Sequence, residues 1–142
     1  MEKMTSEEMH RFLMATPHTA VLSTVRPDGR PHSTPIWFSM DEDEPVFTTW
    51  HTTVKARNLK HNPNVSFCVQ DEKPPFAYVL IEGRVSIEEA SPQLGAWAAK
   101  IGGRYMGSDR AEEFGARNGV PGEWLVHIKP DKVTAVRGIA DD

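Results

Sequence analysis

Closely spaced turn residues divide the chain into short β-prone runs, and this pattern limits the available folds more than any other feature. The 142 residues include 11 prolines and 10 glycines. Residues 19–25, 46–50 and 65–70 are rich in the β-branched and aromatic side chains that are typical of strands. Short antiparallel strands remove their exposed edges by closing into a barrel. We therefore expect a mainly β fold, a β-barrel with helices, with six to seven mostly antiparallel strands.

Helices are expected where capping signals precede an apolar stripe. Thr5 and Glu8 match a capping box, which predicts a helix that ends near Thr16. A pair of helices is expected between residues 91 and 119, inserted before the last strands. In the first of this pair, apolar residues recur with helical spacing until Gly102–Gly103, where we expect the helix to end.

Prolines and glycines also mark irregular points within the strands. One continuous strand is expected over residues 31–40, and its Pro35 predicts an edge strand or a bulge because proline has no N–H to donate. Gly83 interrupts the strand expected over residues 76–87 and predicts a bulge or a barrel corner. Two separate final strands are expected within residues 124–136.

Composition narrows the class of protein. A net charge of −4 and a pI of about 5.9 argue against a nucleic-acid-binding protein, which needs a basic surface. The single cysteine, Cys68, excludes an intrachain disulfide framework. The polar segment Met1–Glu8 does not resemble a signal peptide, and no apolar run has the length of a membrane span. We expect one domain over residues 1–142, located in the cytoplasm, with neither nucleic-acid nor membrane partners.

Residues 45–61 contain no acid, although they form a strand, a hydroxyl-rich turn and a short helix. Thr52 or Thr53 can cap this helix, and its first turns hold Lys55 and Arg57. Helix N-termini favour negative charge, so cations there suggest a bound anion such as a phosphate. A solvated basic face is the alternative, since Lys55 and Arg57 are two residues apart and lie on different sides of the helix. The residues alone leave both interpretations open.

Motifs for phosphate-binding loops, dinucleotide binding, thiol redox chemistry and metalloproteases are all absent. The six histidines lack metal-ligand spacing, so no metal is expected, and His51 fits a structural role better than a catalytic one. No side chain is assigned as catalytic. Trp37 and Trp50 lie beside the candidate anion site and either stack on a flat ligand or belong to the core. Such a scaffold suits a redox enzyme whose cofactor carries the chemistry.

A series of short motifs extends this interpretation. They are Val21–Thr24, Pro27–Pro31, Thr34–Trp37, Lys55–Leu59, Asn62–Pro63, Ile81–Gly83, Arg104–Gly107 and Arg117–Glu123. In this order and spacing they resemble the pyridoxamine 5'-phosphate oxidase-like split β-barrel superfamily, and within it the flavin/deazaflavin oxidoreductases that use coenzyme F420. The resemblance extends from about Ala20 to Gly138. It implies a split β-barrel like that of FMN-binding proteins, in a homodimer with two cofactor sites at the interface.

The resemblance also implies particular cofactor contacts. Lys55 matches the residue that holds the cofactor phosphate, and Arg57 and Asn58 belong to the same motif. Thr48 and Thr49 match a strand end that lies along the phosphate and ribityl chain. One strand is implied to face the cofactor ring, with the residues Ser33, Thr34, Pro35, Ile36 and Trp37. Tyr78 matches the position from which the partner subunit reaches the ring.

The sequence departs from the family pattern at two places, and both affect the expected activity. The chain ends in residues 136–142 without the basic segment of true pyridoxamine-phosphate oxidases, so vitamin B6 oxidation is not expected. Thr53 stands where some F420-binding relatives have a second cation, which leaves FMN as an alternative cofactor. The expected function is an oxidoreductase that uses reduced coenzyme F420 to transfer hydride to a conjugated small-molecule acceptor. The alternatives are an FMN-dependent oxidoreductase of the same fold and a non-enzymatic flavin-binding protein.

Overall fold

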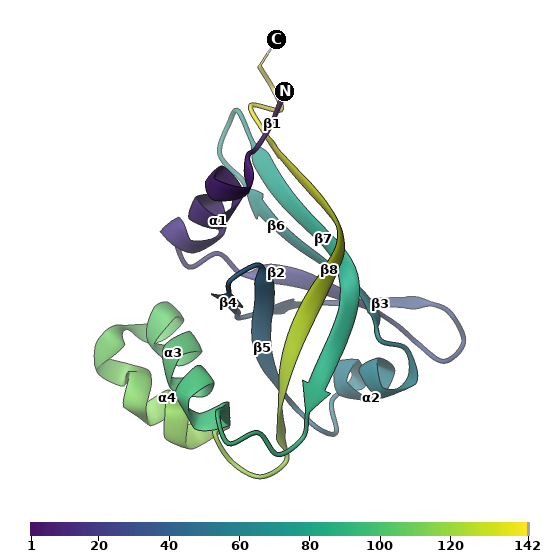
Figure 1. Cartoon of the computed structure of the whole chain (residues 1–142), viewed down its shortest axis with the longest axis vertical. Coiled ribbons are helices and arrows are strands. Elements are labelled where there is room, and N and C mark those ends of the chain that lie inside the picture. The colour runs from purple at the N-terminus through teal and green to yellow at the C-terminus, as the bar shows by residue number, and fades with distance from the viewer. Residues whose placement is uncertain (142) are drawn as a thin grey trace.

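A computed structural model, which describes residues 1–141, shows one antiparallel sheet of eight strands with four α-helices at its margins (Figure 1). The strands are β1 (Glu2–Lys3), β2 (Ala20–Val25), β3 (Pro31–Ile36), β4 (Ser39–Asp41), β5 (Glu44–Trp50), β6 (Asn64–Asp71), β7 (Ala77–Glu88) and β8 (Glu123–Arg137). The helices are α1 (Ser6–Ala15), α2 (Val54–His61), α3 (Leu94–Met106) and α4 (Ala111–Asn118), with a short 3-10 helix η1 (Ser108–Arg110) before α4.

The strand order shows that the sheet is a barrel with one open seam. The order is β3-β2-β6-β7-β8-β5-β4, and β1 pairs with β8 outside this path. The end strands β3 and β4 are consecutive in the chain and are separated by Trp37 and Phe38 alone. The sheet must therefore curl until its two ends meet, without hydrogen bonds between them. This split β-barrel confirms the predicted fold class.

The inside of the barrel is a continuous hydrophobic core. Phe38, Phe47 and Phe67 are fully buried there, and the rings of Phe38 and Phe67 meet edge to face at 4.9 Å. Helix α1 contributes Leu13 to the same core, and its predicted capping box between Thr5 and Glu8 is present. Helices α3 and α4 lie side by side next to β5 (Figure 1). None of the helices in residues 1–141 is long and apolar enough to cross a bilayer.

The prediction of one continuous strand over residues 31–40 is wrong, because the chain leaves the sheet at Trp37 and Phe38. The backbone of Phe38 is bonded by side chains of α3 instead of a neighbouring strand. Its N–H donates to the Tyr105 hydroxyl at 3.1 Å, and its carbonyl accepts from Arg104 at 2.6 Å. Buried backbone groups need such partners, so the end of α3 stabilises the seam. Strand β3 lies at the end of the sheet, which confirms the edge position predicted from Pro35.

The prediction that Gly102–Gly103 ends its helix is also wrong, because α3 continues to Met106. A Cβ atom at position 102 would clash with the side chain of Phe114, and one at position 103 would lie 2.9 Å from the Cβ of Ala111. These glycines therefore allow α3 to pack closely against α4. The helix ends one turn later at Gly107, which has a φ of +108°.

The two final strands predicted within residues 124–136 are one strand, β8. Its register with β7 shifts at Gly83: Glu82 pairs with Lys132 and Gly83 with Pro130, so Asp131 is an extra residue opposite this step. The bulge predicted at Gly83 is thereby confirmed. A side chain at this position would clash with the carbonyl of Lys129, which explains why glycine is needed there.

Candidate functional site

Two threonine hydroxyls fix the start of α2, which follows the end of β5. Thr53, rather than Thr52, is the N-cap, and its hydroxyl accepts the N–H of Ala56 at 3.2 Å and donates to the carbonyl of Trp50 at 3.0 Å. The hydroxyl of Thr49 lies 3.0 Å from that of Thr53. The first turn of α2 is therefore tied to β5, and this fixes the direction in which Lys55 leaves the helix.

Lys55 lines a cavity of about 190 Å³ at the seam of the barrel. The walls come from the ends of β3 and β5, from the start of α2, from α3 and α4, and from the start of β8. The lining residues are Pro35, Ile36, Trp37, Thr48, Lys55, Ala98, Ile101, Asn118 and Glu123. The predicted site residues Pro35, Ile36, Trp37, Thr48 and Lys55 are thus brought together from three separate segments.

Lys55 and Glu123 are the charged groups of this cavity, and each is half-buried. Burial lowers the pKa of Lys55, and the nearby charge of Glu123 partly opposes this shift. Burial raises the pKa of Glu123, against a hydrogen bond from Thr48 and the charge of Lys55. Both residues lie in the described part of the chain, yet no ion pair within 4.0 Å joins them. The Lys55 ammonium therefore keeps donors for another partner.

Trp37 forms a flat wall of the cavity and packs against one residue from each of the helices α3 and α4. Its ring stacks on Tyr105 with a centroid distance of 5.1 Å and an angle of 7°, and it meets Phe114 edge-on at 5.7 Å. The Tyr105 hydroxyl is itself fixed, because it donates to the carbonyl of His18 at 2.6 Å. Trp37 is thus a preset surface against which a planar group could stack.

Trp50 and His51, by contrast, lie outside the cavity. Trp50 is exposed and packs on the ring of His51 at a centroid distance of 4.6 Å. The Nδ1 atom of His51 lies 2.9 Å from the carbonyl of Gly122. His51 thus contacts the turn before β8, in agreement with the structural role expected for it.

The remaining predicted site residues are placed elsewhere in this chain. The buried amide of Asn58 donates to the hydroxyl of Thr24 at 3.0 Å, and Arg57 is exposed on a separate hollow. The hydroxyl of Ser33 lies 2.8 Å from that of Ser23. Thr49 supports the N-cap of α2. Tyr78, on β7, does not line the Lys55 cavity, so a contact with a cofactor would have to be made across a subunit interface. The cofactor contacts of these residues stay predictions.

Glu123 is the residue that the sequence interpretation did not assign to the site. Residues 45–61 do lack acids, but pairing of β5 with β8 places Glu123 opposite Trp50. Its carboxylate thereby approaches Lys55 from a distant part of the chain. The nearest signal in the sequence was the strand expected from residue 124, but strand pairing cannot be read from such local patterns.

Among the described residues, three buried polar atoms without partners lie on the strands β3 and β4 that border the seam. Within residues 1–141, the buried atoms Nδ1 of His32, Oγ1 of Thr34 and Oγ of Ser39 have no hydrogen-bond partner. Such atoms are uncommon in folded proteins and often mark sites that are completed by a ligand or a water. His32 and Thr34 lie on the edge strand β3, two residues apart. Neither residue lines the Lys55 cavity, where the Lys55 ammonium and the flat Trp37 wall could hold a phosphate and a planar ring.

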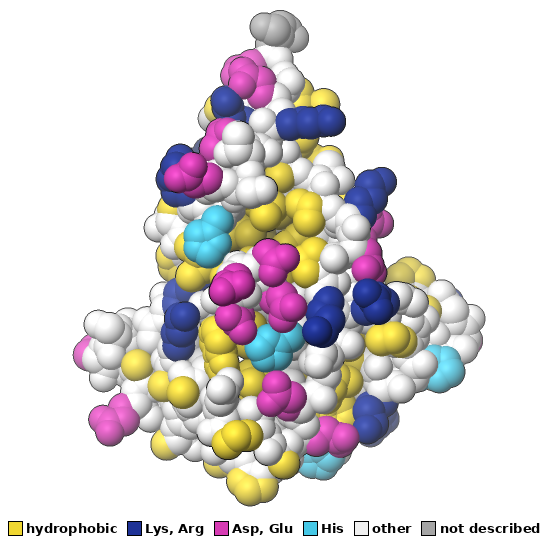
Figure 2. Space-filling view, viewed as in Figure 1, with side chains coloured by type: hydrophobic (Ala, Val, Ile, Leu, Met, Phe, Trp, Pro, Cys, Tyr) yellow, Lys and Arg dark blue, Asp and Glu magenta, His cyan; other side chains and the backbone are white. Residues whose placement is uncertain are grey.

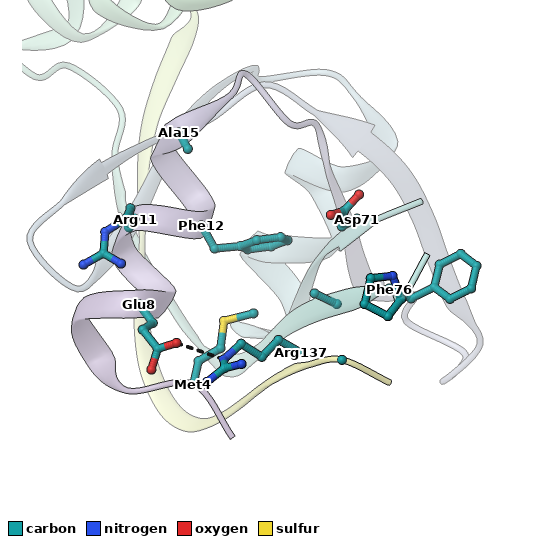
Figure 3. Close-up of a pocket in the computed structure, with 11 residues that line it drawn as sticks. Met4, Glu8, Arg11, Phe12, Ala15, Asp71, Phe76 and Arg137 are labelled. Atoms are coloured by element: carbon teal, nitrogen blue, oxygen red, sulfur yellow. Dashed lines mark hydrogen bonds and ion pairs between the residues drawn. The ribbon is translucent and has the colours of Figure 1, made fainter. Parts of the chain in front are cut away.

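Two other features of the surface do not share this chemistry. A second cavity, of about 370 Å³, lies between α1 and the start of β7, where Phe12 points inward and Glu8 pairs with Arg137 at 3.0 Å (Figure 3). It contains none of the predicted site residues.

On another face, acidic side chains gather around a histidine (Figure 2). Here His127 lies 3.4 Å from Glu44, but no group within residues 1–141 has a metal-binding arrangement.

Comparison with known proteins identifies the family. The profile of the family described as Pyridoxamine 5'-phosphate oxidase matches residues 5–137. The chain belongs to the pyridoxamine 5'-phosphate oxidase family. A curated member of this family, the pyridoxine/pyridoxamine 5'-phosphate oxidase of Burkholderia mallei, is 32% identical over 123 residues, which cover 72% of this chain. The aligned part is 56% of that enzyme, so the chain spans little more than half of the relative's length.

Solved structures support the same assignment. A conserved hypothetical protein from Mycobacterium tuberculosis aligns with a TM-score of 0.84 and 26% identity over 98% of this chain and 89% of its own. A protein described as an F420 reductase aligns with a TM-score of 0.68 and 29% identity over 87% of this chain and 94% of its own. The pyridoxamine 5'-phosphate oxidase fold of this chain is thus shared by proteins with different names.

Proposed function

We propose that this chain is an oxidoreductase that binds reduced coenzyme F420 at the Lys55 cavity and passes hydride to a conjugated small-molecule acceptor. The observation that carries the proposal is the half-buried Lys55, which faces a cavity with a flat aromatic wall and has no ion-pair partner within the described residues. The similarity to the F420 reductase, at 29% identity over most of both chains, favours the deazaflavin over other cofactors.

The chain's own residues would bind and orient the cofactor. The Lys55 ammonium would donate charge-assisted hydrogen bonds to its phosphate, with Thr48 beside it. Trp37 and the β3 segment Ser33–Ile36 would fix the position of the ring. Coenzyme F420, when bound, supplies the hydride. Since no side chain of the cavity has the arrangement of a general acid-base pair, the protein would act by holding donor and acceptor in reacting positions.

The size of the cavity supports a homodimer. About 190 Å³ is less than the volume of ordinary small-molecule sites, so one chain would cover only part of a cofactor. A row of side chains crosses the outer face of the sheet: Pro35 pairs with Val21, Val21 with Cys68, and Cys68 with Leu80. Val21 is 45% exposed within the single chain. We propose that a second copy covers this face and completes the site, and light scattering of the purified chain would measure this directly.

Side-by-side titration of the apo-protein with F420 and FMN is the first test. Tight binding of F420 supports the proposal, whereas exclusive binding of FMN favours the FMN-dependent alternative. Reduced cofactor is then offered with a panel of enones and quinones. Binding without acceptor-dependent oxidation would leave a non-enzymatic flavin-binding protein.

The variant Lys55→Ala tests the role of the cavity. Removal of a charged hydrogen bond should weaken cofactor binding by about 1.5–3 kcal/mol with little change in the fold. The exposed Lys129→Ala, on β8, is the matched control, and its affinity should equal that of the wild type. Unchanged affinity of Lys55→Ala in a fluorescence titration would refute the phosphate role.

A further inference from the structure

Glu123 places a negative charge in the Lys55 cavity, which is unusual for a site that binds phosphate. Phosphate sites commonly collect several cations or backbone N–H groups. Here the lining residues include one cation, Lys55, and one carboxylate, Glu123. The carboxylate and the Thr48 hydroxyl line the same cavity. A ligand that reaches Lys55 therefore also approaches a negative charge.

The other walls of the cavity strengthen this effect. They are formed by uncharged residues: Pro35, Ile36, Trp37, Thr48, Ala98, Ile101 and Asn118. Three of these, Ile36, Ala98 and Ile101, are buried. Charges beside such walls are screened less than charges at an open surface, so Glu123 repels each added negative charge on a ligand more strongly than a surface carboxylate would.

The two candidate cofactors differ in this respect. The phosphate of FMN is a monoester and carries close to two negative charges at neutral pH. The phosphate of F420 is a diester and carries one, and the carboxylates of its tail lie farther along the molecule. A monoester beside Glu123 therefore meets about twice the electrostatic repulsion that a diester meets.

We propose that Glu123 is a specificity-determining residue that selects phosphodiester cofactors over phosphomonoester cofactors at the Lys55 cavity. This inference rests on the proposed function, since it assumes that a phosphate binds at Lys55. It explains why one chain can share its fold with FMN-binding proteins and still prefer a deazaflavin. Glu123 acts through charge and needs no contact with the reacting ring.

The variant Glu123→Gln removes the charge and keeps the shape of the side chain. Dissociation constants are measured by fluorescence titration at a pH where Glu123 and the FMN phosphate are both ionised. The probes are F420, FMN and the methyl ester of FMN, which has the same ring but one charge fewer. Since electrostatic energy is proportional to ligand charge, a gain of about threefold for the two diesters should accompany a gain of about tenfold for FMN. Glu112→Gln, on the exposed surface of α4, controls for net charge and should leave all three constants unchanged.

The outcomes separate the two proposals. An equal gain for FMN and its methyl ester, or no gain for either, overturns the role of Glu123 and leaves the F420 proposal intact. If neither F420 nor either flavin binds to wild type or variant, the proposed function and this inference both fail. Thermal unfolding of the variant verifies that it is folded. The ratio of the FMN dissociation constant to that of its methyl ester should be about threefold higher in the wild type than in Glu123→Gln.

Discussion

Lys55 and Asn58 lie one turn apart on helix α2, and they differ in whether their polar groups have partners. Asn58 is 3% exposed, and its amide donates to the buried hydroxyl of Thr24. Lys55 lines a cavity, where Glu123 is near but forms no ion pair with it among the described residues. The hydrogen bonding of Asn58 is completed within the chain, whereas the donors of Lys55 are left without an ionic partner.

This difference teaches how to interpret a motif with several polar residues. The segment Lys55–Leu59 looks uniform in the sequence, and the family resemblance implies cofactor contacts for most of it. The structure divides the segment according to burial and hydrogen bonding. Only Lys55 combines partial burial with free donors, which is the property that binding of an anion requires.

The largest effect on stability is expected from Asn58→Ala. The variant leaves the buried hydroxyl of Thr24 without its partner, so the free energy of unfolding should fall by about 2 kcal/mol. Asn64→Ala is the matched control, because the amide of Asn64 also donates a hydrogen bond, to Asn62, but at an exposed position. Urea unfolding of both variants gives the comparison. An equal loss of unfolding free energy in the two variants would show that the hydrogen bond of Asn58 has no special structural role.

The sequence predicted the architecture better than the site. Local backbone chemistry, which depends on residue type alone, accounts for four correct predictions. These are the barrel, the capping box, the edge position of Pro35 and the bulge at Gly83. Gly102–Gly103 was misinterpreted because a glycine pair that allows close helix packing has the same letters as one that ends a helix. The strand over residues 31–40 was predicted as one because its break depends on Arg104 and Tyr105.

The residues of the Lys55 cavity were predicted only where they belong to local patterns. Lys55 and Thr48 lie within residues 45–61, and Trp37 belongs to the strand that the family resemblance assigned to the ring. Glu123 was missed because its place depends on the pairing of β5 with β8. The charge of the cavity depends on segments that are distant in the sequence. Residues 45–61, which contain no acid, therefore predicted a more positively charged cavity than the structure shows.

A smaller effect on stability is expected from pH, through the carboxyl of Glu123 beside Lys55. The raised pKa of Glu123 means that the folded state holds this proton more tightly than the unfolded chain. Its contribution to stability is therefore present below the unfolded pKa and is lost as pH rises through the folded value. Glu123→Gln should remove this loss and be more stable than wild type near neutral pH, by about 0.5 kcal/mol. Near pH ~4, where the carboxyl is largely protonated, the two proteins should converge. A constant difference across this range, measured by urea unfolding, would contradict the assignment.

The smallest effect is expected from Arg57→Gln, which tests whether the second cation of α2 belongs to the ligand site. Arg57 is exposed on a hollow that it shares with Arg26 and Arg30, and Arg30 is paired there with Asp28 at 2.8 Å. Stability should change by less than about 0.5 kcal/mol, as for other exposed substitutions. Cofactor affinity should change far less than in Lys55→Ala, since Arg57 does not line the Lys55 cavity. A loss of affinity equal to that of Lys55→Ala would show that a bound cofactor extends around the start of α2 to the Arg57 hollow. The distinction between a structural Asn58 and a ligand-binding Lys55 would then not extend to the rest of α2.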